Sequence, residues 1–408
     1  MTPELAERVR RLKPSASVAA KQLVADLKAD GRSVIDLTIG EPDFATPGHI
    51  VDAAIAALRA GATHYTATPG MPALRDAIVE KFRRENGFAV DAKCVIVGSG
   101  AKQIIFEALA ATVEAGTEVI VPAPYWVSYP EMVAVQGGKP VIVPCAQDDG
   151  FKLTPRALEA AITARTAWVV LNTPNNPTGA VYTAAELEAL AAVLERHPQV
   201  AILTDEIYEH LVYGGHDGGI VSFRSVAPQL ADRTLVVNGV SKAYAMTGWR
   251  LGYAVGPETL IAAIEKLIGQ STTCASSISQ FAAIAALTGD QTCVTHAVDI
   301  YRARRDRMVE ILSDAPGLEV TAPSGAFYLY PSVAGLIGRR TRSGKILESD
   351  TDIALHLLED AGVAVLDGAP YGMSPYLRLS FATSIDQVEA GSRAIREACD
   401  RLFETAVG

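Results

Sequence analysis

Apolar residues recur along the chain in two patterns, and each pattern predicts a different kind of element. Between residues 49 and 270, apolar positions spaced three and four residues apart predict amphipathic helices. Several of these stretches begin near Pro, Ser or Thr and end at Gly, as helices commonly do. The predicted helices span 49–61, 72–87, 101–116 and 183–197.

Between these helices lie short apolar runs, rich in β-branched residues, that do not alternate with polar ones. Strands buried on both faces have this pattern, as in a parallel sheet covered by helices. The runs span 94–97, 118–121, 140–143, 167–171, 200–204, 234–238 and 251–255. We therefore predict an α/β fold in which a mostly parallel sheet is sandwiched by helices.

The C-terminal part follows a different pattern. Helices are predicted at 301–312 and 351–362, and strands at 325–331 and 376–382. The strands alternate apolar with polar residues, which favours a sheet with one solvated face. Residues 334–350 are expected to form a surface excursion.

A chain of 408 residues is long enough for two domains. The change of pattern places a large α/β domain at 49–292. We expect residues 1–48 and 293–408 to form a smaller α+β domain.

Composition and charge exclude several classes of protein. The net charge of −10 argues against nucleic acid as the main partner. We see neither a signal peptide nor a run of roughly 20 apolar residues, so we expect a cytoplasmic protein. The five cysteines are widely spaced and the seven histidines have no metal-binding spacing, which favours reduced thiols and no metal site. H-E-x-x-H and G-x-S-x-G are both absent, so zinc and serine hydrolases have no support.

Polar segments follow four of the predicted strands. GSGAK follows CVIV, NTPNNPTG follows AWVVL, DEIY follows VAILT and GVSK follows TLVVN. In parallel α/β sheets, ligands bind outside the carboxyl ends of the strands. The four segments are therefore expected to converge on one site.

Lys242 lies in the most informative segment, GVSKAYAMTGWRLG (239–252). A partly desolvated lysine at a strand end has a lowered pKa, which suits Schiff-base chemistry. Arg250 can return to the same edge and offer its guanidinium to a phosphate. A solvated lysine and a surface arginine are the alternative interpretation.

Gly100, Ala101 and Lys102 open a predicted helix, whose free N–H groups and dipole form a phosphate seat. A dinucleotide-binding motif is disfavoured because Gln103 stands where the third glycine would be.

The segment around Lys242 resembles the cofactor-attachment signature of class I aminotransferases. The resemblance extends over nearly the whole chain, through KPSAS, GEPDF, YWVSYPEM and GAFYLYP. It implies the type I fold of pyridoxal-phosphate-dependent transferases, pyridoxal 5′-phosphate attached to Lys242, and a homodimer with shared active sites. The combination of motifs looks like the gamma subgroup of aspartate aminotransferases, some of whose members accept prephenate.

The resemblance also implies roles around the cofactor. Asp205 faces the pyridine nitrogen and keeps the ring an electron sink, although a helix cap is the alternative role. Tyr208 and Asn176 bind the ring oxygen, Trp126 stacks on the ring, and Ser241 belongs to the attachment segment. Tyr125 and Trp126 are expected to begin a helix.

Further roles concern the substrate and the partner subunit. Arg378 is the expected receptor for the α-carboxylate, and Gly40 lines the same side of the site. Trp126 and Asn176 are also expected to contact the substrate. Lys102 is the candidate for a distal carboxylate, with hydroxyl donors from Ser15 and Ser17. Tyr65 matches a tyrosine that reaches the neighbouring subunit's phosphate.

One position departs from the family pattern. Some relatives carry a serine three residues before the lysine, where this chain has Gly239.

The resulting expectation is amino transfer between aspartate and 2-oxoglutarate by a ping-pong mechanism. Prephenate, aromatic or alanine aminotransferases are alternatives, because side-chain pockets are poorly resolved by sequence. A regulator with an aminotransferase-like module is disfavoured, since residues 1–48 contain no helix-turn-helix pattern.

Overall fold

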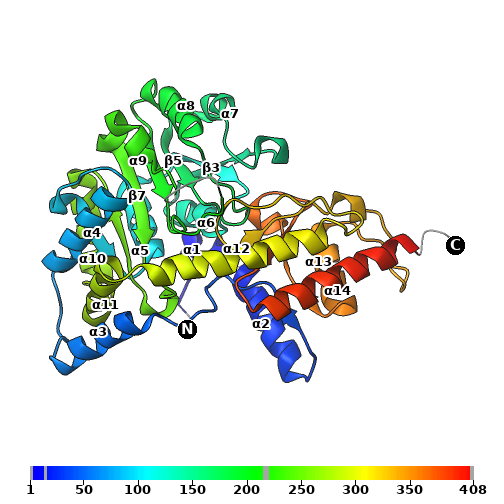
Figure 1. Ribbon diagram of the computed structural model, residues 1–408. Coiled ribbons are helices and arrows are strands. Elements are labelled where there is room, and N and C mark those ends of the chain that lie inside the picture. The colour runs from blue at the N-terminus through cyan, green and yellow to red at the C-terminus, as the bar shows by residue number, and fades with distance from the viewer. Residues whose placement is uncertain (1–2, 13–15, 215–219, 405–408) are drawn as a thin grey trace.

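The centre of the fold is a seven-stranded sheet with the strand order β2-β8-β7-β6-β5-β3-β4 (Figure 1). We analysed a computed structural model that describes residues 3–12, 16–214 and 220–404. β8 is antiparallel to both neighbours and the other pairs are parallel, which confirms the predicted mostly parallel sheet. The seven strands coincide with the seven predicted runs: β2 (Val95–Gly98), β3 (Glu118–Ala123), β4 (Lys139–Pro144), β5 (Thr166–Asn172), β6 (Ala201–Asp205), β7 (Thr234–Gly239) and β8 (Gly252–Val255).

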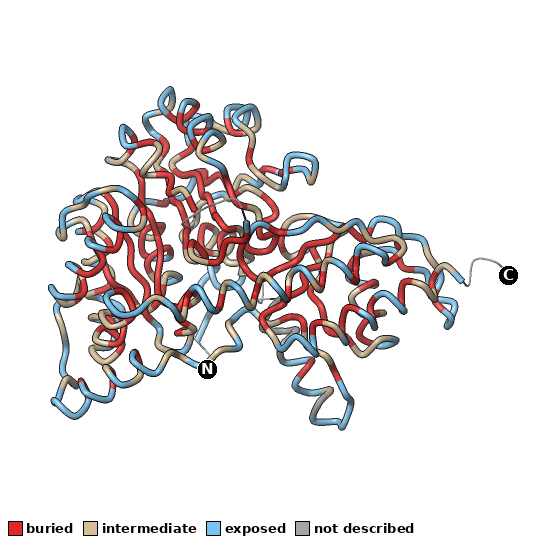
Figure 2. The backbone as a smooth tube through the Cα atoms, viewed as in Figure 1, coloured by how far each residue is buried: buried red, intermediate tan, exposed pale blue. Residues whose placement is uncertain are grey.

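Helices cover both faces of this sheet, as successive strand residues point to opposite sides. One face packs against α5 (Ala101–Thr112), α6 (Ser128–Val135) and α10 (Glu258–Ser271). The other face has two sets of helices. They are α3 (Gly48–Arg59), α4 (Pro72–Glu85) and α11 (Ser277–Thr288), and then α7 (Pro155–Ala161), α8 (Ala184–Glu195) and α9 (Phe223–Val226). Figure 2 shows the strands as the buried centre and the outer helix turns as exposed.

The edge strand β4 corrects the prediction that every run is buried on both faces. Only Val143 is buried in β4, and Ile142 is 38% exposed. β2, at the other edge of the sheet, is buried throughout, so the exposure of β4 reflects incomplete cover by helices at its end of the sheet.

The C-terminal part forms a second core. Here α12 (Thr292–Leu312), α13 (Asp350–Asp360) and α14 (Ile385–Glu404) pack around a three-stranded antiparallel sheet of β9 (Tyr328–Leu329), β12 (Leu377–Ser380) and β11 (Leu366–Asp367). In Figure 1, α12 runs from beside the large sheet to this second core. β1 (Ile35–Asp36) pairs with β10 (Val363–Ala364) and brings the N-terminal segment here, with α1 (Glu7–Arg10) and α2 (Ala16–Ala29) preceding it.

The prediction of a solvated face for the small sheet is wrong. Every residue of β12 is buried, including the polar residues Arg378 and Ser380. These two side chains alternate with Leu377 and Leu379, so the sheet does have a polar face. That face is turned into the protein, because Arg378 binds groups from other segments.

The structure differs from the predictions in three further respects. The long helix α14 was not predicted, and β9 is shorter than the predicted strand at 325–331. The expected surface excursion at 334–350 is anchored by the fully buried Leu336 and Leu347. The domain division at residues 49 and 292 stays a prediction.

No helix within the described residues is long and apolar enough to cross a membrane. The five cysteines are free.

Candidate active site

The carboxyl ends of β2, β5, β6 and β7 lie at one edge of the large sheet. β2 and β7 are both antiparallel to β8, so they run in the same direction, and the register sets Gly98 and Gly239 on either side of Gly252. Asn172 at the end of β5 pairs with Asp205 at the end of β6. The four predicted segments therefore meet, as expected for this class of sheet.

Lys242 follows β7 and lies at the centre of this edge. Its Nζ donates a hydrogen bond to the Gly40 carbonyl at 2.6 Å, and it is 5.5 Å from the centre of the Tyr208 ring. Burial lowers the pKa of the Lys242 amine to about 8, although the nearby Glu41 carboxylate opposes the shift. The neutral, nucleophilic amine is therefore much more populated near neutral pH than for a solvated lysine.

Asp205 ends β6 as a buried carboxylate. Its Oδ2 accepts a hydrogen bond from the Tyr129 hydroxyl at 2.7 Å, and its Oδ1 accepts from the Ile207 backbone N–H at 3.2 Å. Burial raises the pKa of Asp205 to about 6, against the opposing effects of these bonds and of Lys242. A carboxylate buried in this way binds a cationic ring nitrogen favourably.

The start of α5 and the guanidinium of Arg250 form a candidate anion-binding site. Gly100 precedes the helix with φ +94°, and a Cβ there would lie 2.7 Å from Arg250 Nη2. Arg250 donates to the carbonyls of Thr247 and Ser99 at 2.9 and 3.3 Å. A helix start leaves backbone N–H groups without partners, although here the Gln103 N–H donates to the Gly100 carbonyl at 3.1 Å. The start of α5 and Arg250 can therefore offer donors to one anion.

Gly252 explains how this helix start comes so close to the sheet. A Cβ on Gly252 would lie 2.2 Å from the backbone nitrogen of Ala101. Any residue other than glycine at this point of β8 would clash with the start of α5. Glycine therefore allows the helix start to lie against the strand, next to Arg250.

Lys102 lies on the indole of Trp126, with Nζ 4.7 Å from the ring centre. Burial lowers the pKa of Lys102, and the positive charge of Arg250 adds to the shift. Trp126 packs edge-on against Tyr129, with ring centres 5.2 Å apart. Trp126 stands in the loop before α6, which begins at Ser128, so the prediction that Tyr125 and Trp126 begin the helix is wrong by two to three residues.

Arg378 enters the site from β12. It is 3% exposed, and it donates to the Thr38 carbonyl at 2.7 Å and to Asn176 Oδ1 at 3.2 Å. Its guanidinium lies 4.5 Å from the centre of the Tyr328 ring, and its Nε has no hydrogen-bond partner among the described residues. A buried guanidinium with an unused donor suits a carboxylate ligand.

Asn176 and Tyr208 are held by residues that sequence reasoning did not select. The Asn176 backbone N–H donates to Asn172 Oδ1 at 2.9 Å, and the hydroxyls of Tyr208 and Tyr328 are 2.9 Å apart. Tyr129, Thr38 and Asn172 were also missed. Tyr129 and Tyr328 lie in the quoted segments YWVSYPEM and GAFYLYP, which was the only sign of their importance.

Within the described part of the chain, the other predicted residues form no hydrogen bond or ion pair with the groups named above. Tyr65 is 85% exposed and therefore faces away from the interior of its own chain. Ser241 is buried beside Lys242. Ser15 lies outside the described residues, and Ser17 belongs to α2 but its side chain is outside the description.

Comparisons with known proteins show which family the chain resembles. Residues 32–395 match the family model described as aminotransferase class I and II. The chain is 51% identical to a probable aspartate/prephenate aminotransferase of Rhizobium leguminosarum bv. phaseoli, over 97% of this chain and 98% of that protein. It is 50% identical to an aspartate/prephenate aminotransferase of Cereibacter sphaeroides, over 99% of each. The crystal structure of the aspartate aminotransferase from Rhizobium meliloti superposes with a TM-score of 0.95 at 47% identity, covering 98% of this chain and 100% of that one.

Proposed function

The chain belongs to the class I and II aminotransferases, and from that premise we propose that it transfers amino groups between aspartate and 2-oxoglutarate with pyridoxal phosphate as cofactor. The observation that carries the proposal is the meeting of four groups at one sheet edge. They are an amine of lowered pKa, a buried carboxylate, a candidate anion-binding site and a buried guanidinium, provided by Lys242, Asp205, Arg250 and Arg378.

The residues present fit this cofactor. Lys242 offers an amine for an aldehyde, Asp205 a carboxylate for a ring nitrogen, and Arg250 with the start of α5 the donors that a phosphate needs. Pyridoxal phosphate, when bound, supplies an aldehyde for amines and a ring that takes up negative charge from the amino-acid α-carbon. Tyr208 and Asn176 are proposed to bind the ring oxygen, and Trp126 to cover the ring.

Asp205, Lys242 and Arg378 then each have a defined role in the reaction. Asp205, kept ionised by its bonds from Tyr129 and Ile207, holds the proton on the ring nitrogen. Lys242, once its amine is free, moves the proton from the substrate α-carbon, and the pKa of about 8 makes it an effective base near neutral pH. Arg378 binds the α-carboxylate and fixes the substrate's orientation.

Lys102 is the proposed contact for the distal carboxylate of acidic substrates. Its partly buried ammonium on Trp126 offers a cation beside the proposed ring site. Prephenate also has a side-chain carboxylate, so it is a second candidate substrate, favoured by the names of two relatives. Aspartate with 2-oxoglutarate remains the proposed main reaction.

The exposed Tyr65 supports a homodimer in which each subunit completes the other's phosphate site. A tyrosine that is 85% exposed in one chain is available to a second copy.

Borohydride reduction of the holoenzyme followed by peptide mapping tests the proposal directly. The label is expected on Lys242, and a label on another lysine would overturn the assignment. A panel of amino donors with 2-oxoglutarate, oxaloacetate and prephenate then ranks the substrates.

The variant Lys102→Ala tests the distal contact. We expect KM for aspartate and glutamate to rise about 10-fold or more, while an apolar donor changes little, because only the distal contact is removed. Equal losses for acidic and apolar donors would assign Lys102 to the cofactor or the fold instead.

A further inference from the structure

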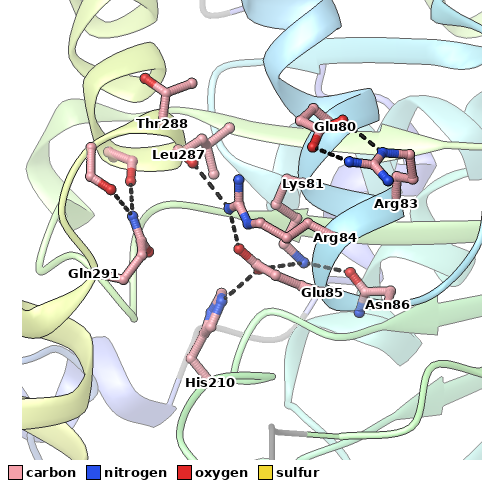
Figure 3. A network of polar contacts seen from close by, with 12 residues as sticks. Glu80, Lys81, Arg83, Arg84, Glu85, Asn86, His210, Leu287, Thr288 and Gln291 are labelled. Carbon is pink, nitrogen blue, oxygen red and sulfur yellow. Dashed lines mark hydrogen bonds and ion pairs between the residues drawn. The ribbon is translucent and has the colours of Figure 1, made fainter.

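A buried network of charged and amide side chains connects the Asp205–Tyr208 segment with the loop that carries Lys242. Its centre is Lys81 on α4, whose side chain is fully buried. Lys81 Nζ donates to Glu209 Oε1 and, at 2.7 Å, to Asn86 Oδ1. Figure 3 shows Lys81 and Asn86 facing each other, with Glu85 and His210 beside them.

Glu209 accepts hydrogen bonds from two other parts of the chain, the end of α4 and the end of β7. Besides Lys81, it accepts from Asn86 Nδ2 at 2.8 Å and from Asn238 Nδ2 at 2.7 Å. Glu209 is 4% exposed, so these donors replace the water that a carboxylate requires. Each part of the network is thereby fixed relative to the other two.

The network is joined through the backbone to the proposed chemistry. Glu209 directly follows Tyr208 and lies four residues after Asp205. Asn238 Oδ1 accepts a hydrogen bond from the Gly239 N–H at 2.7 Å, at the start of the loop that reaches Lys242. The Asp205–Tyr208 segment and the Lys242 loop are therefore tied together at Glu209 and Asn238.

A metal site is the obvious alternative for this cluster. Ligand atoms of Glu85, Glu209 and His210 do lie within 4.8 Å of one another. The Lys81 ammonium, however, already bonds to Glu209 and is 3.5 Å from Glu85 Oε2. A fixed cation of the protein thus provides the positive charge that a metal ion would bring.

Stability alone is a weak reason for such a network. A buried ion pair commonly contributes no more stability than well-packed apolar side chains of similar volume, whereas its directional bonds fix geometry. Here the fixed geometry concerns the segments of Asp205 and Lys242.

We propose that Lys81, Glu209 and Asn238 are positioning residues that set where the Lys242 amine stands relative to the Asp205 carboxylate. This inference rests on the proposed function, since it assigns both groups to the cofactor. None of the three is proposed to touch substrate. They act on proton transfer through the backbone that carries Lys242, Asp205 and Tyr208.

The chain offers a matched control on the outer side of the same lysine. Glu85 Oε2 lies 3.5 Å from Lys81 Nζ and 3.0 Å from His210 Nε2, and Glu85 is only partly buried. Glu85→Gln removes a carboxylate charge next to Lys81 and leaves the bonds among Lys81, Glu209 and Asn238 in place. It therefore separates general destabilisation from loss of positioning.

The experiment compares Asn238→Ala and Glu209→Gln with Glu85→Gln, each as holoenzyme with its cofactor content measured. Asn238→Ala leaves the Lys81–Glu209 pair intact, so it serves where the loss of charge in Glu209→Gln prevents folding. The readouts are kcat and KM for aspartate, the kinetic isotope effect with α-deuterated aspartate, and the pH midpoint of the bound cofactor's absorbance change.

For the two inner variants we expect kcat to fall about 10- to 100-fold with KM within about threefold, because geometry at the proton-transfer step is lost. The isotope effect should rise, and the absorbance midpoint should move by about half a pH unit or more. Glu85→Gln should keep kcat within about twofold and leave the midpoint unchanged, even where its melting temperature falls.

Two results would overturn the network's role. The first is inner variants that melt earlier but keep kcat and the midpoint, and the second is a Glu85→Gln enzyme that loses as much kcat as they do. Failure of the proposed function is distinguishable, because it would appear in the unmodified protein as a missing borohydride label on Lys242.

Discussion

Replacement of Arg378 tests the proposed substrate site most directly. Arg378 is 3% exposed, and its guanidinium donates one bond to the Thr38 carbonyl and one to Asn176 Oδ1. A guanidinium has five N–H donors, so two bonds to the protein leave enough for a carboxylate. The planar group also lies against the Tyr328 ring, which restricts its orientation.

The expected magnitude follows from the bonds that a carboxylate would lose. Two charge-assisted hydrogen bonds at about 1.5–3 kcal/mol each amount to about 3–6 kcal/mol, or a loss of roughly 10²- to 10⁴-fold in kcat/KM. Arg378→Gln removes the charge and should show this loss in full. Arg378→Lys restores a point charge without the fork and should recover only part of it.

The assay is the steady-state kcat/KM for aspartate with 2-oxoglutarate, on enzyme whose cofactor content is matched by absorbance. Cofactor affinity serves as the control, because Arg378 is assigned to the substrate and not to the phosphate. Arg378→Lys activity equal to that of the unmodified enzyme would refute bidentate binding. A parallel loss of cofactor affinity would show that Arg378 supports the fold of the site.

Three further predictions concern other residues. Asp205→Asn should keep the cofactor bound but lower kcat by about 10²-fold or more, measured in single turnovers with aspartate, because the ring nitrogen loses its anionic partner; near-normal turnover would reduce Asp205 to a turn-forming residue. Mixing Tyr65→Ala with Lys242→Ala subunits should restore activity above the sum of the two separate proteins, because a mixed dimer contains one intact site; no recovery would exclude a shared site. Burial, with the charge of Glu209, raises the pKa of Glu206 from 4.5 to about 8. Between these two values the folded chain holds a proton that the unfolded chain releases. The free energy of unfolding therefore falls as the pH rises through this range. Glu206→Gln should remove up to about 1.4 kcal/mol of this loss per pH unit in urea unfolding between pH 5 and 8, and an unchanged slope would contradict a neutral Glu206.

The large sheet could be predicted because all its strands except β4 are largely buried on two faces. Runs such as AWVVL and TLVVN cannot lie at a surface, and the polar segments after them identify the edge where a ligand binds. The prediction of an α/β aminotransferase was confirmed by the sheet and by the relatives. The roles of Lys242 and Arg250 stay predictions.

The small sheet was harder because its alternating residues have two interpretations. Arg378 and Ser380 look like the solvated face of a strand, and only tertiary packing turns that face inward. The partners Tyr129 and Tyr328 were missed for a similar reason. Tyr129 meets Asp205 across 76 residues of sequence and Tyr328 meets Tyr208 across 120, so no local spacing indicates either contact.

In the proposed mechanism, the loop between β7 and β8 would set how long the cofactor stays with the enzyme. Gly239 and Gly252 pair at the base of this loop, which holds Lys242 near one end and Arg250 near the other. In the proposed reaction the Lys242 amine must be free to move a proton, so during that step it would not hold the cofactor. The proposed phosphate donors, Arg250 and the start of α5, are separate from the lysine side chain, and the close approaches at Gly100 and Gly252 bring them together. The proposed roles thus assign cofactor retention to the phosphate donors and bond making to Lys242, so one cofactor molecule would serve many catalytic cycles.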